Sequence, residues 1–472
     1  MKKTICVLIV CFIYCIIFLV VPCVEVQSEG KNERILTLAE FMVSVARNDT
    51  EFEEILIDEL SLRYEKDLIL PARDLVFDIK TEYDFMLDHE REEPRASVGL
   101  SKLFPFTGTA LNAEYATTPS YTSGNSSTEM TYELTQPIAR NAFGHATRLK
   151  DKIIGLEIDV AKHQIVEAYE DYLATLIVAY YDWYEAYENV LISKSSYVEN
   201  VKLLDNIKDR QKSKIAVSVD VNKTELQVLA KKEKLISLQE TYSRALNIIQ
   251  TALRHENQET LIPQKPLLYT DIDIVFDRDF DSFNNAGRTF QVLHLLEAKS
   301  ELDVDENADD LLPSIDLLFG YNVKGTDRNF DDSNNMMYAG VSLQYPFPSQ
   351  VERAEYAVAK IARDKTAISN KNVYYQLWRD CKNVWIAIKR EKELIAIADE
   401  KIKLGQSVLD DESENYTYGK VTLNDYIQAV NALDTNRFNK VAREVEVRRL
   451  IVEWLRLTDQ LISRKEIEEQ QK

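Results

Sequence analysis

The sequence predicts an internally duplicated α+β membrane protein built from long antiparallel helical hairpins. Three observations support this fold class. Helical periodicity continues through two very long segments, several short segments alternate apolar and charged residues, and both features occur once in each half of the chain. The 12 glycines and 11 prolines among 472 residues also favour long helices over a loop-rich enzyme.

Residues 1–28 are predicted to form a secretory signal peptide. Lys2 and Lys3 precede an apolar run that ends before Pro22, and a cleavage site follows near Ser28. The run is long for a signal, so an uncleaved membrane anchor is an alternative. Lipidation of Cys23 is a third reading, and the sequence leaves the choice open.

Composition argues against several classes of function. Four of the five cysteines lie in or beside the N-terminal segment, which leaves Cys381 alone in the mature chain. An exported protein without an internal disulfide is typical of the bacterial envelope. The formal charge of −21 argues against nucleic acid as a partner. Without metal-ligand spacing, a phosphate loop or a nucleophile elbow, the sequence predicts no enzyme, no metal site and no cofactor.

The first structural repeat is expected over residues 29–256. It opens with a helix that Thr37 and Glu40 cap together, and Pro71 ends the helical region. From Leu75 onward every second residue is apolar and the others are charged, which is the pattern of a two-faced strand. Strands are expected at residues 75–85, 96–103, 109–116 and 130–136.

A very long helix follows the strands, from about Ala146 to Ser213. One apolar seam begins at Ile154, and a second stripe runs beside it from Val166 to Tyr184. Two adjacent stripes suit a helix with a neighbour on each side, as in a ring of helices. After a tip near residue 214, a return helix completes the hairpin.

The second repeat, residues 286–472, copies this order after a linker at residues 257–285, which is expected to be irregular and equatorial in position. Strands are expected within 311–323 and 341–347, and the second long hairpin turns near residue 419. When the two tips are aligned, Lys214 matches Gly419 and Asp220 matches Asp425. Agreement in element order, proline positions and tip spacing indicates an internal duplication.

Four stretches carry a resemblance to a known family: "LTLAEFMVSVARND", "LTQPI", "LQYPF" and "YTYGKVTLNDY". With the duplicated order of elements, they resemble the TolC-like outer-membrane efflux proteins over nearly the whole mature chain. The second tip looks like the family's tyrosine-x-x-glycine…aspartate motif. The first tip keeps the aspartate but has Lys214 where the glycine would stand.

The resemblance implies a homotrimer in the bacterial outer membrane that extends into the periplasm. In this family three subunits close one 12-stranded β-barrel in outer-membrane lipid, and their helices form a hollow α-barrel. The implied function is a passive exit duct for efflux or type I secretion, which docks a periplasmic adaptor and an inner-membrane transporter. The family usually has four strands per chain, so the hairpin at residues 96–116 is an extra one whose place the sequence leaves open. Neither the cargo nor the pump can be read from the sequence.

The resemblance also implies a gate at the periplasmic tips. Asp425 falls where the family places an aspartate that constricts the entrance, and Asp220 falls where a partner for Tyr416 is found. Gln428 replaces a second acid and Val421 replaces the arginine of that lock, which implies a looser gate. Without the resemblance, both aspartates read as ordinary acids at helix starts.

The tip turns are the expected docking site for the adaptor, through Gly419, Lys214, Val421 and Thr422. A simpler reading of Gly419 is a helix-ending residue with a left-handed backbone. The alternative function is a structural or adaptor-like periplasmic coiled-coil protein, which would have no need of the alternating strands.

Overall fold

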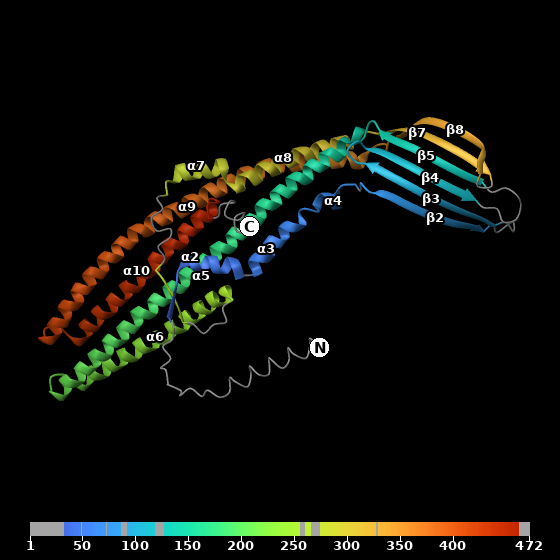
Figure 1. Cartoon of the computed structure of the whole chain (residues 1–472). Helices are drawn as coiled ribbons and strands as arrows, with labels where there is room; N and C mark the ends of the chain where they lie inside the picture. The colour runs from blue at the N-terminus through green and yellow to red at the C-terminus, as the bar shows by residue number, and fades with distance from the viewer. Residues whose placement is uncertain are drawn as a thin grey trace, which may run out of the picture.

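A computed structural model describes residues 33–48, 50–71, 73–85, 92–118, 127–254, 260–265, 274–326 and 329–461. The molecule is elongated, with a β-sheet at one end and two helical hairpins at the other (Figure 1). The predicted signal peptide, Cys23 and Ser28 lie outside the described residues. Among the described helices, none contains an apolar stretch long enough to cross a bilayer.

The sheet contains six strands that follow one another in chain order, each antiparallel to its neighbour (Figure 1). All the strands expected from the sequence are present. The strands are β2 (Leu75–Phe85), β3 (Glu92–Phe104), β4 (Thr109–Thr118), β5 (Ser127–Pro137), β7 (Ser314–Thr326) and β8 (Asn329–Gln344).

The ladder register gives the sheet one apolar and one polar face, since paired residues share a face. One row of partners across the first five strands is apolar: Ile79, Val98, Tyr115, Met130 and Val323. The adjacent row, on the opposite face, is polar or small: Asp78, Gly99, Glu114, Thr131 and Asn322. The predicted two-faced pattern therefore extends across the first five strands.

Two helical hairpins extend away from the sheet. The first consists of α5 (His145–Lys212) and α6 (Ser218–Leu253), and the second of α9 (Gln350–Thr417) and α10 (Leu423–Leu457). At 68 residues, α5 and α9 are each about 100 Å long. Helix α5 packs against α6 and also against α10, as its two apolar stripes predict. The order of neighbouring helices is α6, α5, α10, α9.

The largest core surrounds the middle of α5. The strand β1 (Glu33–Leu36) pairs in parallel with β6 (Thr260–Pro263), and α2 (Leu38–Asn48) packs beside them. Tyr180 and Trp183 of α5 are completely buried, and the Tyr180 hydroxyl donates to the Leu36 carbonyl oxygen at 2.7 Å. The expected capping box of α2 forms, with the Glu40 amide donating to Thr37 Oγ1 at 3.1 Å.

The expectation of an irregular linker at residues 257–285 is wrong in part. That range contains β6 and α7 (Phe276–Ala286), an amphipathic helix. Phe276, Phe280 and Phe283 recur at helical spacing and are buried against α9 and α10. The aspartates between them gave the segment the composition of a loop, which concealed its helical period.

Shorter helices lead into the sheet or out of it. These are α3 (Thr50–Ser61) and α4 (Glu65–Ile69), the 3₁₀ turn η1 (Ala142–Gly144), and α8 (Arg288–Asp309), which packs between α5 and α9. The short α4 ends two residues before Pro71, as the proline predicts. At the junction with the sheet, Arg140 Nε donates to Asp310 Oδ1 at 2.9 Å.

Candidate functional site

The two tips lie together at the end of the molecule farthest from the sheet (Figure 1). Lys214 and Gly419 both have left-handed backbones, with φ of 63° and 71°. The alignment of the two tips predicted this equivalence. A Cβ on Gly419 would meet nothing within 4 Å, so glycine is favoured here by the left-handed backbone and not by a lack of space.

The hydrogen bonds that close the two turns are also equivalent. The Ile215 amide donates to the Arg210 carbonyl oxygen at 2.8 Å, and the Lys420 amide donates to the Asn415 carbonyl oxygen at 2.9 Å. Both are bonds from the residue after the left-handed position back to the last helical turn, the geometry of a Schellman-type helix end. Gly419 is therefore a helix-ending residue with a left-handed backbone, as the simpler interpretation predicted.

Asp425 caps the start of α10. Its Oδ2 accepts from the Thr422 amide at 3.1 Å and from Thr422 Oγ1 at 2.7 Å. These bonds hold the pKa of the Asp425 carboxyl below its usual range. At the first tip, Asp220 accepts from the Val217 amide at 3.4 Å. Both carboxylates act as helix-start acids, and their role in a pore stays a prediction.

Tyr416 contacts Tyr426 of its own hairpin and Arg210 of the other hairpin. Its ring stacks on Tyr426 with centroids 5.9 Å apart, and the Arg210 guanidinium lies 4.8 Å from the Tyr416 ring centroid. Burial raises the pKa of Tyr416, while Arg210 opposes this shift. In the described part of the chain no hydrogen bond joins Tyr416 to Asp220, which acts on it as a nearby charge.

Sequence reasoning missed Arg210. Its partner Tyr416 belongs to the other repeat, so nothing local to either residue signals the contact. The available signal was the alignment of the tips, which places Arg210 one helical turn before Lys214, as Asn415 lies one turn before Gly419. Leu203 and Ile207 of α5 and Leu423 of α10 are buried beside the aromatic pair.

The tips expose several apolar side chains. Ile215, Val217, Val219 and Tyr418 are all more than half exposed. Thr422 is exposed and Val421 is half-buried. A hollow of about 370 Å³ lies between the ends of α5 and α9. Arg210 and Tyr416 are among the residues that line it.

A buried polar cluster lies farther up the hairpins. Lys231 Nζ of α6 lies 2.6 Å from Asp434 Oδ2 of α10, and their side chains are 15% and 5% exposed. Ser196 Oγ of α5 also donates to Asp434, and Ser196 is buried. One carboxylate thus joins three helices from both hairpins. Within the described residues, no group of three His, Cys, Asp or Glu side chains is arranged to hold a metal ion.

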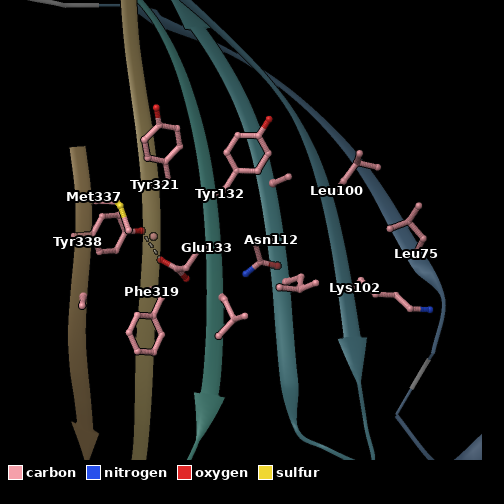
Figure 2. A pocket seen from close by; sticks show the side chains of 15 residues that line it. Leu75, Leu100, Lys102, Asn112, Tyr132, Glu133, Phe319, Tyr321, Met337 and Tyr338 are labelled. Carbon is pink, nitrogen blue, oxygen red and sulfur yellow. Dashed lines mark hydrogen bonds between the residues drawn. The ribbon is translucent and has the colours of Figure 1, made fainter. Parts of the chain in front are cut away.

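A hollow of about 870 Å³ extends over the apolar face of the sheet (Figure 2). Its lining comes mostly from that face and includes Leu100, Tyr132 and Tyr321. Tyr338 lies on the opposite face, where its hydroxyl donates to Glu133 Oε2 at 2.8 Å (Figure 2). Its ring covers Gly320, where a Cβ would collide with it.

The arrangement of strands and helices was compared with known proteins. No family model and no curated protein matches the sequence. The structure aligns with the channel-forming protein CusC at a TM-score of 0.70, with 10% identity over 89% of this chain and 91% of CusC. The chain has the fold of TolC-like outer-membrane channels. The resemblance predicted from the sequence is thereby confirmed at the level of the fold.

Other solved channels agree with this result. The outer-membrane protein VceC of Vibrio cholerae aligns at a TM-score of 0.69, with 11% identity over 89% of this chain and 95% of VceC. The Campylobacter jejuni outer-membrane channel CmeC aligns at 0.66, with 12% identity over 92% and 89%. At such identities the fold is shared while individual tip residues are free to differ.

Proposed function

We propose that this protein is the outer-membrane exit duct of an efflux or type I secretion assembly. One observation carries the proposal: a sheet with a continuous apolar face is joined to helices about 100 Å long. In lipid only closed barrels and helices satisfy their backbone groups, so a sheet that enters a membrane must close. The sheet would lie in the bacterial outer membrane and the helices would span the periplasm.

A single chain leaves both edges of its sheet open. Within the described residues, β2 and β8 each pair on one side only. Unpaired backbone groups are costly in hydrocarbon, so further copies must supply the partners. Helices α6 and α9 form the two edges of the helical layer and would meet between copies. We infer a homotrimer, as in the resemblance, with a shared barrel in contact with outer-membrane lipid.

The tips form the entrance in this proposal. Three copies of Asp425 around the trimer axis would make a ring that attracts cations. The stacked contact of Arg210, Tyr416 and Tyr426 would hold the two hairpins of each chain together in the closed state. The latch is therefore assigned to Arg210 and Tyr416, with Asp220 in the supporting role of a nearby charge and helix cap.

A periplasmic adaptor would dock at the two turns. The exposed apolar side chains of Ile215, Val217 and Tyr418 surround Lys214 and Gly419. Apolar residues gathered at the end of a hairpin favour a protein partner over solvent. An inner-membrane transporter would supply the energy through the adaptor, because we assign the duct itself passive conduction without catalysis or a cofactor.

The alternative is a structural or adaptor-like periplasmic coiled-coil protein. The apolar face of the sheet weighs against it, since such a protein has no use for lipid-facing strands. Cell fractionation followed by electrophoresis with and without heating distinguishes the two. The duct predicts heat-modifiable trimers in the outer-membrane fraction. A protein that stays with the inner membrane and forms no pore would exclude the duct.

A further inference from the structure

We propose that the barrel of this protein has eighteen strands, because each of three copies supplies the six strands of one continuous sheet. The proposal rests on the trimeric duct argued above. It replaces the twelve strands implied by the resemblance, which require four strands from each chain. The additional pair is β3 and β4, the hairpin whose place the sequence left open.

The additional pair lies inside the sheet. Strand β3 pairs with β2 from Lys102 at one end of their ladder to Glu92 at the other. Strand β4 pairs with both β3 and β5. Removing the pair would break the ladder that joins β2 to β5. A hairpin that packed inside the barrel or outside it would not carry ladders on both sides.

The faces of β3 and β4 match those of the other strands. Val98 and Leu100 of β3 continue the apolar face, and their partners on β4 are Tyr115 and Ala113. Ser97, Ser101, Asn112 and Glu114 fall on the polar face. A barrel wall needs lipid-facing and lumen-facing residues in alternation. The pair therefore has the sequence of a membrane wall.

The turn between β3 and β4 is built into the junction with the helices. Arg148 Nη1 of α5 donates to the Phe106 carbonyl oxygen at 2.7 Å, and Gln136 Nε2 donates to the Thr107 carbonyl oxygen at 2.9 Å. Gly144 has φ of 76°, and a Cβ there would lie 2.4 Å from the Phe106 carbonyl oxygen. The chain thus needs glycine beside this turn, which fixes the pair at the helical end of the sheet.

Six strands per chain also allow antiparallel pairing at the seam between copies, where β8 of one copy meets β2 of the next. Neighbouring strands alternate, so β2 and β8 run in opposite directions. The β8 strand of one copy can therefore pair in antiparallel fashion with β2 of the next, which an odd number of strands would prevent. Both edges expose the same apolar face: Phe77 is 60% exposed on β2, and Val341 and Leu343 are each 67% exposed on β8.

The difference is large enough to measure. Barrel diameter grows roughly in proportion to strand number, so eighteen strands make a barrel about 1.5 times as wide as twelve. Strand β3 begins and β4 ends at the same end of the sheet. Deletion of residues 92–118 therefore joins β2 to β5 through the remaining loop residues and leaves four strands in the same order.

The test is cryo-electron microscopy of the full-length trimer and of the 92–118 deletion, each in lipid nanodiscs. We expect eighteen strands in the full-length barrel and twelve, in a barrel narrower by about a third, in the deletion variant. A full-length trimer with twelve wall strands and the hairpin outside the wall would overturn the inference and leave the duct standing. A full-length protein that forms no trimeric barrel would overturn both.

Disulfide crosslinking provides a second readout at the seam. Ile79→Cys would be combined in turn with Met337→Cys, Ala339→Cys and Val341→Cys, which share its face. Cys381 is fully buried, and burial raises the pKa of its thiol to about 12, so it will not compete. We expect a crosslinked trimer from at least one same-face pair. Gly340→Cys, on the opposite face, is the matched control. An intact trimer without any same-face crosslink would contradict the seam.

Discussion

Replacing Arg210 with alanine should open the entrance of the duct. The guanidinium of Arg210 lies 4.8 Å from the Tyr416 ring centroid and joins the end of α5 to the end of α9. Among the described residues, its buried Nε has no hydrogen-bond partner. Truncation at Cβ therefore removes the contact with the Tyr416 ring. No described hydrogen-bond acceptor loses a partner when the Nε is removed.

The expected effect follows from the contact and the symmetry. A cation–π pair that is partly shielded from water contributes about 1 kcal/mol. Loss of that energy shifts an opening equilibrium roughly 5-fold in each chain, since a tenfold change corresponds to about 1.4 kcal/mol. If the three contacts of a trimer break together, the shift is on the order of 100-fold.

The assay is single-channel recording in planar bilayers. Arg210→Ala should raise the open probability, while Arg210→Lys should keep part of the closed-state preference because it retains the cation. Arg244→Ala is the matched control, since Arg244 is an exposed arginine of α6 paired within its own helix to Glu240 at 3.1 Å. Equal open probability in Arg210→Ala and wild-type trimers would refute the latch.

Three other predictions concern the tips and the polar cluster. Gly419→Ala should lower the free energy of unfolding by about 1 kcal/mol through backbone strain, and Lys214→Gly should raise it by a similar amount, both measured by denaturant titration. The pKa of Asp425 is lowered, so its charge and its helix cap persist above that lowered value and are lost as pH falls through it. In bilayer recordings, cation selectivity should therefore survive mild acid in the wild-type protein and be absent in Asp425→Asn. Asp434→Leu should destabilise by about 3–5 kcal/mol because Lys231 is left buried and unpaired, and Lys231→Met should recover much of this in thermal melts.

The sequence predicted most of the fold because the relevant periods are local. Two-residue alternation from Leu75 and the apolar stripes of α5 each depend on neighbouring side chains, so they can be read from one segment. The capping pair Thr37 and Glu40 is equally local, and both of its bonds form. The duplicated order then indicated that Lys214 and Gly419 occupy the same left-handed position.

Features that depend on distant partners could not be predicted in the same way. Arg210 gains its meaning from Tyr416 in the other repeat. The three phenylalanines of α7 are buried by α9 and α10, and their acidic surroundings hid the helix. The hydrogen bond from Tyr338 to Glu133 likewise joins β8 to β5, and nothing in the sequence beside Tyr338 indicates that partner.

The resemblance implied four strands per chain, whereas the structure has six strands in one sheet. The alternation at residues 96–116 was legible, but its position in space depends on ladders to β2 and β5, which only the structure supplies. The likeness to solved channels fixes the fold and leaves such local insertions undetermined.

Planar-bilayer recording of purified trimers tests the duct most directly. Wild-type and Arg210→Ala proteins would be inserted from detergent after their trimeric state is verified by native mass spectrometry. We predict discrete current steps from both, with longer open times in the variant. Intact trimers that give no steps in either form would contradict the proposal that this protein is a channel.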